Sequence, residues 1–292
     1  MRVCSLLPSA TEIVGRLGLA DCLVGVSAEC NWPPEVRQLP VVTSARVDSR
    51  SLTSGDIDAA VRETVADGRP LYAIDEDLLD ELRPDVIVTQ DLCAVCAVSA
   101  GDVATLAPTT AHVLSLDPTT LDEIAQSVEL LGSELGARER GEAVAAEFRA
   151  TITAVGQQTK GLPKKRVCGV EWLDPPFAAG HWVPEMVAAA GGEEGLGRPG
   201  QPSFATTWDD VREAEPELIV VAPCGFDVGR AAREAAGIEF PAVAIAVAAD
   251  AYYSRPAPAV ADGICQLAFL LHSAEAADPG LPWIALQPSG VR

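Results

Sequence analysis

The most regular feature of the chain is a series of short, continuous apolar runs separated by longer segments with helical spacing. Typical runs are VIVT at 86–89, AHVLSL at 111–116 and LIVVA at 218–222. Runs that are apolar throughout, without alternation, are typical of strands that are buried on both faces of a parallel sheet. Helical segments between such strands predict an α/β fold in which helices cover both faces of each sheet.

This pattern occurs twice along the chain. The triplet RVC opens an apolar run at residues 2–4 and again at 166–168, and PDVIV at 84–88 is echoed by PELIVV at 216–221. Each echo follows an acidic helical stretch and runs into a loop that contains cysteine. A repeated order of elements indicates repeated structural units. We therefore predict two Rossmann-like lobes with parallel-rich sheets, formed by residues 1–117 and 161–292.

The segment between the lobes, residues 118–160, is predicted to be helical. Apolar residues recur at helical spacing from Leu121 to Leu135 and again further along. Gly136 and Gly141 leave open whether the segment forms one helix with a weak middle or two helices. A long linker helix as the connection predicts a rigid strut between the lobes.

Composition narrows the classes of function. The 292 residues include 42 acidic and 21 basic side chains, which gives a formal net charge of -21. Such a chain repels phosphate backbones and anionic lipids, so we expect neither a nucleic-acid partner nor insertion into a membrane. The first residues show no signal peptide, and eight cysteines without export suit a reducing compartment. We therefore expect a cytoplasmic protein, in which Cys4 and Cys168 are buried core residues.

The candidate site lies in the loops that follow the apolar runs. Parallel sheets bind ligands at the carboxyl ends of their strands, and two facing lobes would bring these ends to one cleft. Aromatic residues make up only 5% of the chain, yet most tryptophans and tyrosines fall in these loops. They suit a flat, partly apolar small molecule, or alternatively they wedge the lobes together. The predicted ligand-binding residues are Pro8, Ser9, Trp32, Gln90, Asp91, Cys93, Glu171, Trp172, Phe177, His181, Trp182, Phe204, Tyr252, Tyr253 and Arg255.

Local patterns at some of these positions allow a second interpretation. Ser9 or Thr11, just before an apolar helix, is typical of a helix N-cap, although the helix N-terminus also offers N–H groups to a ligand. The segment AGGEEGLGRPG at 190–200 lacks the features of a phosphate loop and is interpreted as a connection. Of the three histidines, His181 is the candidate site residue, and the other two are interpreted as structural.

No arrangement typical of a hydrolase or a zinc protease occurs in the chain, so we predict binding and no catalytic residues. Cys93 and Cys96 have the spacing of a redox pair, of half a zinc site or of two adjacent inert thiols. Zinc would need further ligands, which Cys30, Cys224 or His181 would supply only in a closed cleft. Thiolates would also suit a metal carried inside a ligand, so Cys93 and Cys96 are the candidate metal-binding residues.

Several motifs together carry a family resemblance. The opening RVCSLLPSATEIVGRLG, then SAECNWPPEV, PDVIVTQ, DPPFAAGHW and AYYSRPAP resemble the vitamin B12-binding branch of the helical-backbone substrate-binding proteins of ABC importers. The chain is similar to a subgroup without a signal peptide that carries TQDLCxVC. The resemblance covers nearly the whole sequence, although Gln90 stands where the B12 receptors have a tryptophan.

The resemblance implies two lobes joined by a rigid helix, with a corrinoid or related metal chelate held between them by aromatic side chains. It places Trp32, Phe177, Tyr252, Tyr253 and Arg255 at the ligand, and it implies either an ABC permease or a cytosolic protein as the partner. The expected function is that of a carrier, a sensor or an importer's substrate-binding protein. Two alternatives stay open: an enzyme that modifies such a ligand through Cys93 and Cys96, and a regulatory module that docks on a partner protein.

Overall fold

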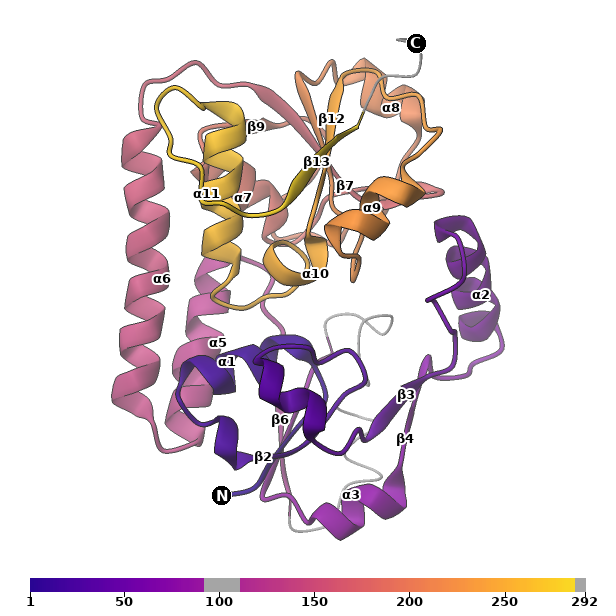
Figure 1. Ribbon diagram of the computed structural model, residues 1–292, viewed down its shortest axis with the longest axis vertical. Helices are drawn as coiled ribbons and strands as arrows, with labels where there is room; N and C mark the ends of the chain where they lie inside the picture. The colour runs from indigo at the N-terminus through magenta and orange to yellow at the C-terminus, as the bar shows by residue number, and fades with distance from the viewer. Residues whose placement is uncertain (92–110, 287–292) are drawn as a thin grey trace. The chain divides into compact units, whose positions relative to one another are not determined.

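The computed structural model describes residues 1–91 and 111–286, which fold into two compact units (Figure 1). The first unit comprises Met1–Leu52, Asp56–Pro118 and Ile124–Ala146. The second comprises Thr53–Gly55, Thr119–Glu123 and Glu147–Arg292. The predicted class, an α/β protein with two units and parallel-rich sheets, is confirmed.

The first unit is built on a four-stranded parallel sheet with the strand order β2-β1-β5-β6. Its apolar runs became strands that are mostly buried, as continuous apolar patterns require. The strands are β1 (Val3–Ser5), β2 (Leu23–Val26), β5 (Val86–Thr89) and β6 (His112–Ser115). Around them lie α1 (Pro8–Arg16), α2 (Ser54–Ala66), α3 (Glu76–Leu82), 3-10 turns at Ala20–Cys22 and Pro34–Gln38, and the antiparallel pair β3 (Thr43–Ala45) and β4 (Tyr72–Ile74).

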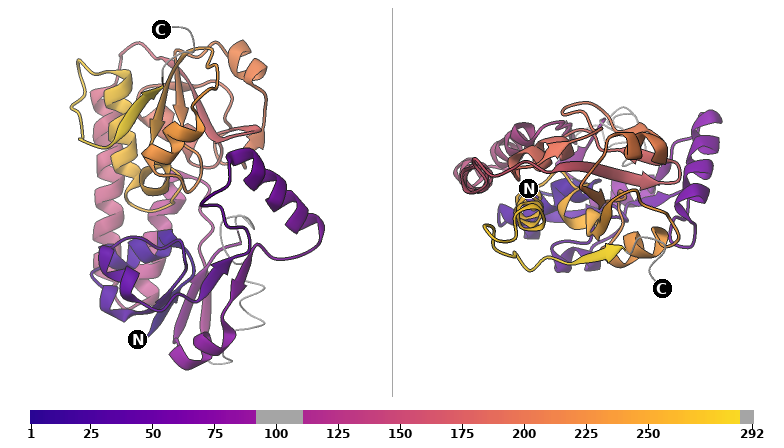
Figure 2. Two further views of the ribbon diagram at one scale, coloured as in Figure 1. Left: turned by 45° about the vertical axis from the view of Figure 1, so that its right-hand side comes forward. Right: turned by 90° about the horizontal axis from the view of Figure 1, so that it is seen from above.

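The second unit contains a seven-stranded sheet in which β10, β8, β7, β11, β12 and β13 follow one another and β9 pairs with β7. Strands β7, β11 and β12 are parallel, whereas β8, β10 and β13 are antiparallel additions. Helices α8 and α9 cover one face of this sheet, and α7 and α11 cover the other (Figure 2). The strands are β7 (Arg166–Leu173), β8 (Pro176–Ala178), β9 (Glu193–Glu194), β10 (Phe204–Ala205), β11 (Leu218–Val221), β12 (Val243–Val247) and β13 (Trp283–Leu286). The helices are α7 (Val183–Ala189), α8 (Trp208–Glu213), α9 (Val228–Glu234), α10 (Ala249–Tyr252) and α11 (Val260–Leu271).

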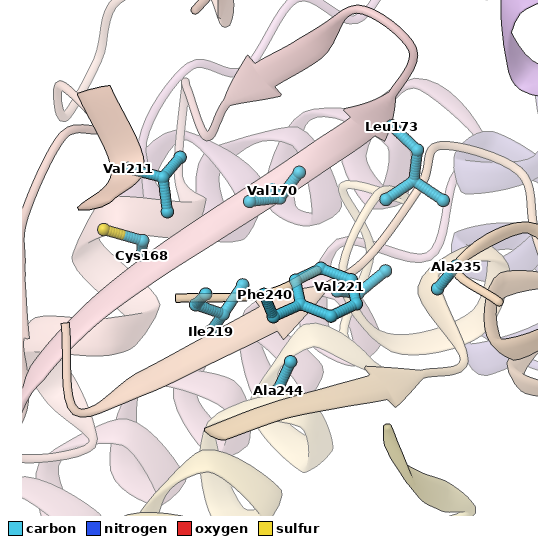
Figure 3. Packing of buried hydrophobic residues seen from close by; sticks show 9 residues of the cluster. All are labelled: Cys168, Val170, Leu173, Val211, Ile219, Val221, Ala235, Phe240 and Ala244. Atoms are coloured by element: carbon cyan, nitrogen blue, oxygen red, sulfur yellow. The ribbon is translucent and has the colours of Figure 1, made fainter. Parts of the chain in front are cut away.

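The repeat seen in the sequence is also a repeat of strand register. In the first unit, Cys4 on β1 lies opposite Ile87 on β5. In the second unit, Cys168 on β7 lies opposite Ile219 on β11. Both cysteines have no exposed surface, and burial raises the pKa of each thiol to about 12, as predicted for core residues. Figure 3 shows the core around the second of them, formed by Cys168, Val170, Leu173, Val211, Ile219, Val221, Ala235, Phe240 and Ala244.

The segment at 118–160 forms two helices, which is one of the two alternatives that the sequence leaves open. They are α5 (Leu121–Glu134) and α6 (Arg138–Gln158), which run side by side. Gly136 lies between them with a backbone φ of +74°, a left-handed conformation that glycine adopts readily and that ends a helix. None of the helices in the described part of the chain has both the length and the apolar composition that a membrane span requires.

The α5–α6 hairpin makes a prediction about Gly132. A Cβ atom added there would lie 2.8 Å from the Cα of Gly141, so the two backbones approach too closely for a side chain. Alanine normally stabilises a helix relative to glycine, but here we expect Gly132→Ala to lower the free energy of unfolding by about 1–3 kcal/mol. The measurement is urea denaturation of both proteins.

Gly156 on α6 is the matched control, because an added Cβ would meet only the Ala189 carbonyl oxygen, at 3.9 Å. We expect Gly156→Ala to raise the free energy of unfolding by about 0.5–1 kcal/mol, the ordinary helix preference. Equal effects of the two substitutions would show that the close approach of the glycines does not limit stability.

Candidate functional site

In the second unit, the predicted residues gather where the parallel strands end. Glu171 near the end of β7 connects two other loops: its carboxylate accepts the N–H of Gly180 at 3.1 Å, and its carbonyl accepts the N–H of Cys224 at 3.0 Å. The loop after β11 is joined in turn to the segment after β12, because Asp250 donates its N–H to the Phe226 carbonyl at 3.1 Å. The loops at this edge therefore form one connected structure.

Trp172 lies at the aromatic end of this structure. Its indole N–H donates to the Ser54 carbonyl at 3.1 Å, and its ring centroid lies 5.3 Å from that of Phe226. Arg230, a residue of α9, places its guanidinium 3.8 Å from the ring centroid of Phe226. Trp172 stays half-buried, whereas Phe226 is only 3% exposed. Phe226 is therefore the buried ring of this contact, and Trp172 is the ring with accessible surface.

His181 and Trp182 form a second aromatic pair. Their ring centroids are 5.8 Å apart with planes at 28°, which is a stacked arrangement. Trp182 is 5% exposed, and its indole N–H donates to the Tyr253 carbonyl at 2.7 Å. Burial lowers the pKa of His181, so its imidazole is neutral at pH values near neutrality. The buried, hydrogen-bonded ring of Trp182 thus packs against one face of the half-buried imidazole.

The tyrosine loop after β12 divides its side chains between the surface and the core. Tyr253 is 1% exposed, and its hydroxyl donates to the side-chain oxygen of Gln266 at 2.8 Å. Gln266 in turn donates to the carbonyls of Leu281 and Pro282. Burial raises the pKa of Tyr253, which stays protonated. Of the predicted pair, Tyr252 is half-buried and has accessible surface, whereas Tyr253 anchors the loop.

Phe177 and Phe204 lie on the antiparallel strands at one side of the second sheet. Phe177 on β8 is opposite Trp172 on β7 and also opposite Ala205 on β10. Phe204 is half-buried, and the guanidinium of Arg198 lies 4.8 Å from its ring centroid. Arg255, predicted as a ligand contact, has 6% of its surface exposed.

We call the connected set Glu171, Trp172, His181, Trp182, Cys224, Phe226, Tyr252 and Tyr253 the edge cluster.

In the first unit, the predicted capping role of Ser9 or Thr11 was wrong. Helix α1 begins at Pro8 after Leu7, and no side chain caps it. Thr11 instead faces the strand ends: its hydroxyl donates to Ser5 Oγ at 2.8 Å and lies 3.0 Å from the Cys30 sulfur. The sequence pattern misled because proline already supplies a first-turn residue that needs no N–H partner.

The remaining predicted residues of the first unit lie at the same edge of its sheet. Ser9 is 3% exposed, and Gln90, directly after β5, is 6% exposed. Asp91 is exposed, and its backbone N–H donates to a carboxylate oxygen of Asp117. Trp32 is half-buried and lies under the guanidinium of Arg16, 5.2 Å from the ring centroid. The first unit therefore presents polar groups and one partly accessible tryptophan where its strands end.

The candidate metal ligands Cys93 and Cys96 lie outside the described residues, so their predicted role stays a prediction. Within the described ranges, no group of three or more histidine, cysteine, aspartate or glutamate side chains is placed to hold a metal ion. Cys30 is buried with its sulfur beside the hydroxyls of Thr11 and Ser27, and Cys224 is exposed. A bare ion therefore finds no complete ligand set in this part of the chain.

Sequence reasoning missed a carboxylate that organises the glycine-rich segment. Glu194 on β9 accepts the backbone N–H groups of Gly169, Leu196 and Gly197 at 3.1–3.2 Å. Burial raises the pKa of this carboxyl group to about 7, although the backbone amides lower it. The signal was present as an acidic residue inside a run of glycines, whose N–H groups can converge on one acceptor.

Glu194 predicts a pH dependence of stability. Its pKa is about 7 in the folded protein, against an ordinary value of 4.5, so between these values the folded state holds more protons than the unfolded state. The contribution to stability is therefore complete below about pH 4.5 and is lost as the pH rises through about 7, with a size of about 3 kcal/mol. Urea denaturation across this range should show the slope.

The variant Glu194→Gln removes the titrating group, and we expect it to flatten this slope. Glu213→Gln on the exposed surface of α8 removes the same charge and should leave the slope unchanged. An unchanged slope in Glu194→Gln would mean that the carboxyl group titrates as in the unfolded chain.

Comparison with known proteins identifies the family to which this fold of two α/β units belongs. The profile of the periplasmic binding protein family matches residues 3–242, and the chain belongs to this family. A vitamin B12-binding protein of Yersinia pestis (strain Pestoides F) is 25% identical over 227 residues, which is 76% of this chain and 69% of that protein. The uncharacterized ABC transporter substrate-binding lipoprotein YvrC of Bacillus subtilis (strain 168) is 23% identical over 56% of this chain, which spans only 43% of that lipoprotein.

Two solved structures show how far the shared fold extends. The periplasmic vitamin B12 binding protein BtuF of Vibrio cholerae superposes with a TM-score of 0.68 at 24% identity, covering 94% of this chain and 97% of that one. A periplasmic heme binding protein from Pseudomonas aeruginosa gives a TM-score of 0.73 at 18% identity, covering 99% of both chains. The two-lobed fold is thus shared with proteins named for different ligands.

Proposed function

We propose that this chain is a non-enzymatic binding protein for a corrinoid or a closely related flat metal chelate. The observation that carries the proposal is the edge cluster of the second unit, in which the end of β7, the loops after β8 and β11 and the end of α10 are joined by hydrogen bonds and present mostly aromatic and uncharged polar side chains. Trp172, His181 and Tyr252 are its half-buried members and supply the surface that a flat ligand would contact.

The charge of the site favours a corrinoid over haem. Haem carries propionate carboxylates, whereas the rim of a corrin ring carries mostly neutral amides. The edge cluster itself contains one carboxylate, Glu171, and otherwise uncharged side chains; the Arg230 guanidinium lies on the ring of Phe226, and the chain as a whole has a net charge of -21. An anionic ligand would be repelled by this field, and an amide-bearing ligand would find hydrogen-bond partners without that cost. The name of the Yersinia relative supports the same ligand class.

The test is retention of hydroxocobalamin through gel filtration, with ferric haem in a parallel sample. We expect a stoichiometric corrin spectrum to elute with the protein. Trp172→Leu should weaken retention, whereas Trp283→Leu, which changes a 40% exposed tryptophan on β13, should not. Retention of haem without cobalamin would leave the binding role and overturn the corrinoid assignment.

We also propose an ABC-type permease as the macromolecular partner, because the lipoprotein relative is named as a substrate-binding component of such a transporter. Co-purification of this chain with the candidate permease in detergent, strengthened by the ligand, is the expected result. Binding to no permease with a loaded site would favour a carrier or sensor role instead.

A further inference from the structure

His181 has an unusual backbone that the surrounding chain maintains. Its φ is +48°, in the left-handed region that costs a non-glycine residue about 1–2 kcal/mol. Two backbone hydrogen bonds hold it there: its N–H donates to the Gln201 carbonyl at 2.6 Å, and its carbonyl accepts the N–H of Gly200 at 2.9 Å. The glycine-rich segment that Glu194 organises therefore also fixes the direction in which His181 leaves the chain.

The side chain of His181 is fixed as well. The imidazole stacks on Trp182, whose own N–H is bonded to the Tyr253 carbonyl, and Tyr253 is bonded to Gln266. A side chain that already packs against a buried, hydrogen-bonded ring loses little further conformational entropy when it binds a ligand.

The nitrogen atoms of His181 differ from those of the other two histidines. Nε2 of His272 lies 3.2 Å from the Gly191 carbonyl, and Nε2 of His112 lies 3.7 Å from a Glu134 carboxylate oxygen. Within residues 1–91 and 111–286, neither imidazole nitrogen of His181 forms a hydrogen bond or an ion pair. A neutral imidazole has one ring nitrogen whose lone pair is available, and this is the form of histidine that binds metals.

One imidazole does not hold a free metal ion, and among the described residues no group of three or more metal-ligating side chains is found around it. It does suit a metal whose equatorial positions are already filled by a planar macrocycle and whose axial position is open. We propose that His181 is an axial ligand to the metal of the bound chelate, held in place by the ring of Trp182 and by the backbone of Gly200 and Gln201. This inference rests on the proposed function and adds a metal–nitrogen bond to it.

The test uses cobinamide, a corrinoid that lacks the nucleotide base and therefore brings no axial nitrogen of its own. The protein is loaded with cobalt(II) cobinamide in anaerobic phosphate buffer, and its electron paramagnetic resonance spectrum is recorded. In the wild-type complex we expect each cobalt line to be split into a triplet by one axial nitrogen. Protein labelled with ¹⁵N-histidine should convert each triplet into a doublet, which identifies the nitrogen as that of a histidine.

The variant His181→Gly should lose the splitting and bind cobinamide on the order of tenfold more weakly or worse. Glycine tolerates a positive φ, so this variant is expected to fold, which urea denaturation verifies. His112→Gln, at a histidine whose side chain is 58% exposed, is the matched control and should keep both the splitting and the affinity.

The outcomes separate the two proposals. Retained cobinamide without nitrogen splitting in the wild type would overturn axial ligation and leave the binding function in place, even if His181→Gly bound more weakly through a lost hydrogen bond. Splitting that persists in His181→Gly would also overturn the assignment. A wild-type protein that retains no cobinamide would overturn the corrinoid function and this inference together.

Discussion

Replacing Gly180 by alanine is expected to cost about 3 kcal/mol or more of the free energy of unfolding and to abolish ligand retention. A Cβ atom at this position would lie 2.2 Å from the backbone nitrogen of Ser203, and no flexible side chain is there to move aside. The Gly180 N–H is also bonded to Glu171, and the next residue is His181. A shift of this segment therefore disturbs two members of the edge cluster at once.

Urea denaturation and hydroxocobalamin retention measure the two effects separately. Gly156→Ala, with room for its added carbon on α6, serves again as the control and should retain the ligand. A Gly180→Ala protein that is as stable as the wild type and still binds would show that the 195–203 segment can move away without consequence for the site.

The second large effect is expected for Gln266→Leu, with a loss of about 2–4 kcal/mol in the free energy of unfolding. Gln266 is 1% exposed, accepts from the Tyr253 hydroxyl and donates to the carbonyls of Leu281 and Pro282. Leucine has a similar size but removes the closer acceptor of the buried Tyr253 hydroxyl, which keeps only the Gly263 carbonyl at 3.5 Å, and a buried polar group that loses its partner costs about 1–3 kcal/mol. The two hydrogen bonds to the carbonyls of Leu281 and Pro282 are lost as well.

The double variant with Tyr253→Phe tests this explanation. Phenylalanine removes the orphaned hydroxyl, so the double variant should be more stable than Gln266→Leu alone. Strictly additive losses in the double-mutant cycle, followed by urea denaturation, would show that the two side chains do not interact. Near-ultraviolet circular dichroism of the aromatic residues would report whether the tyrosine loop has moved.

The strands were predictable from sequence because their signal is local. VIVT and LIVVA are apolar throughout, and such runs are stable only between two layers of helices, so β5 and β11 followed directly. The linker was harder, because the side chains of α5 and α6 continue one apolar pattern. The break between them depends on the backbone conformation of Gly136, which spacing does not reveal.

The candidate site was predictable in position and less so in detail. The sequence places Trp172, His181 and Tyr252 in loops that follow strands. The structure has His181 in the loop after β8, whereas Trp172 lies within β7 and Tyr252 is the last residue of α10. Which aromatic side chains are buried and which are accessible depends on contacts between segments that are distant in the sequence. Trp182 and Tyr253, for example, are joined by a hydrogen bond although 71 positions separate them. Glu194 was missed for the same reason, since its importance comes from backbone amides that converge only when the chain folds.

The place of β13 has a consequence for how the protein is made. Strand β12 pairs with β11 on one side, and on the other side its partner is β13, whose last residue is Leu286. While the ribosome is still producing the segments between them, the apolar sequence VAIAV has an open edge, the kind of edge that joins other chains. Synthesis that stalls between residues 247 and 283 therefore yields an aggregation-prone product, and a chaperone that shields β12 during this interval would protect the nascent protein.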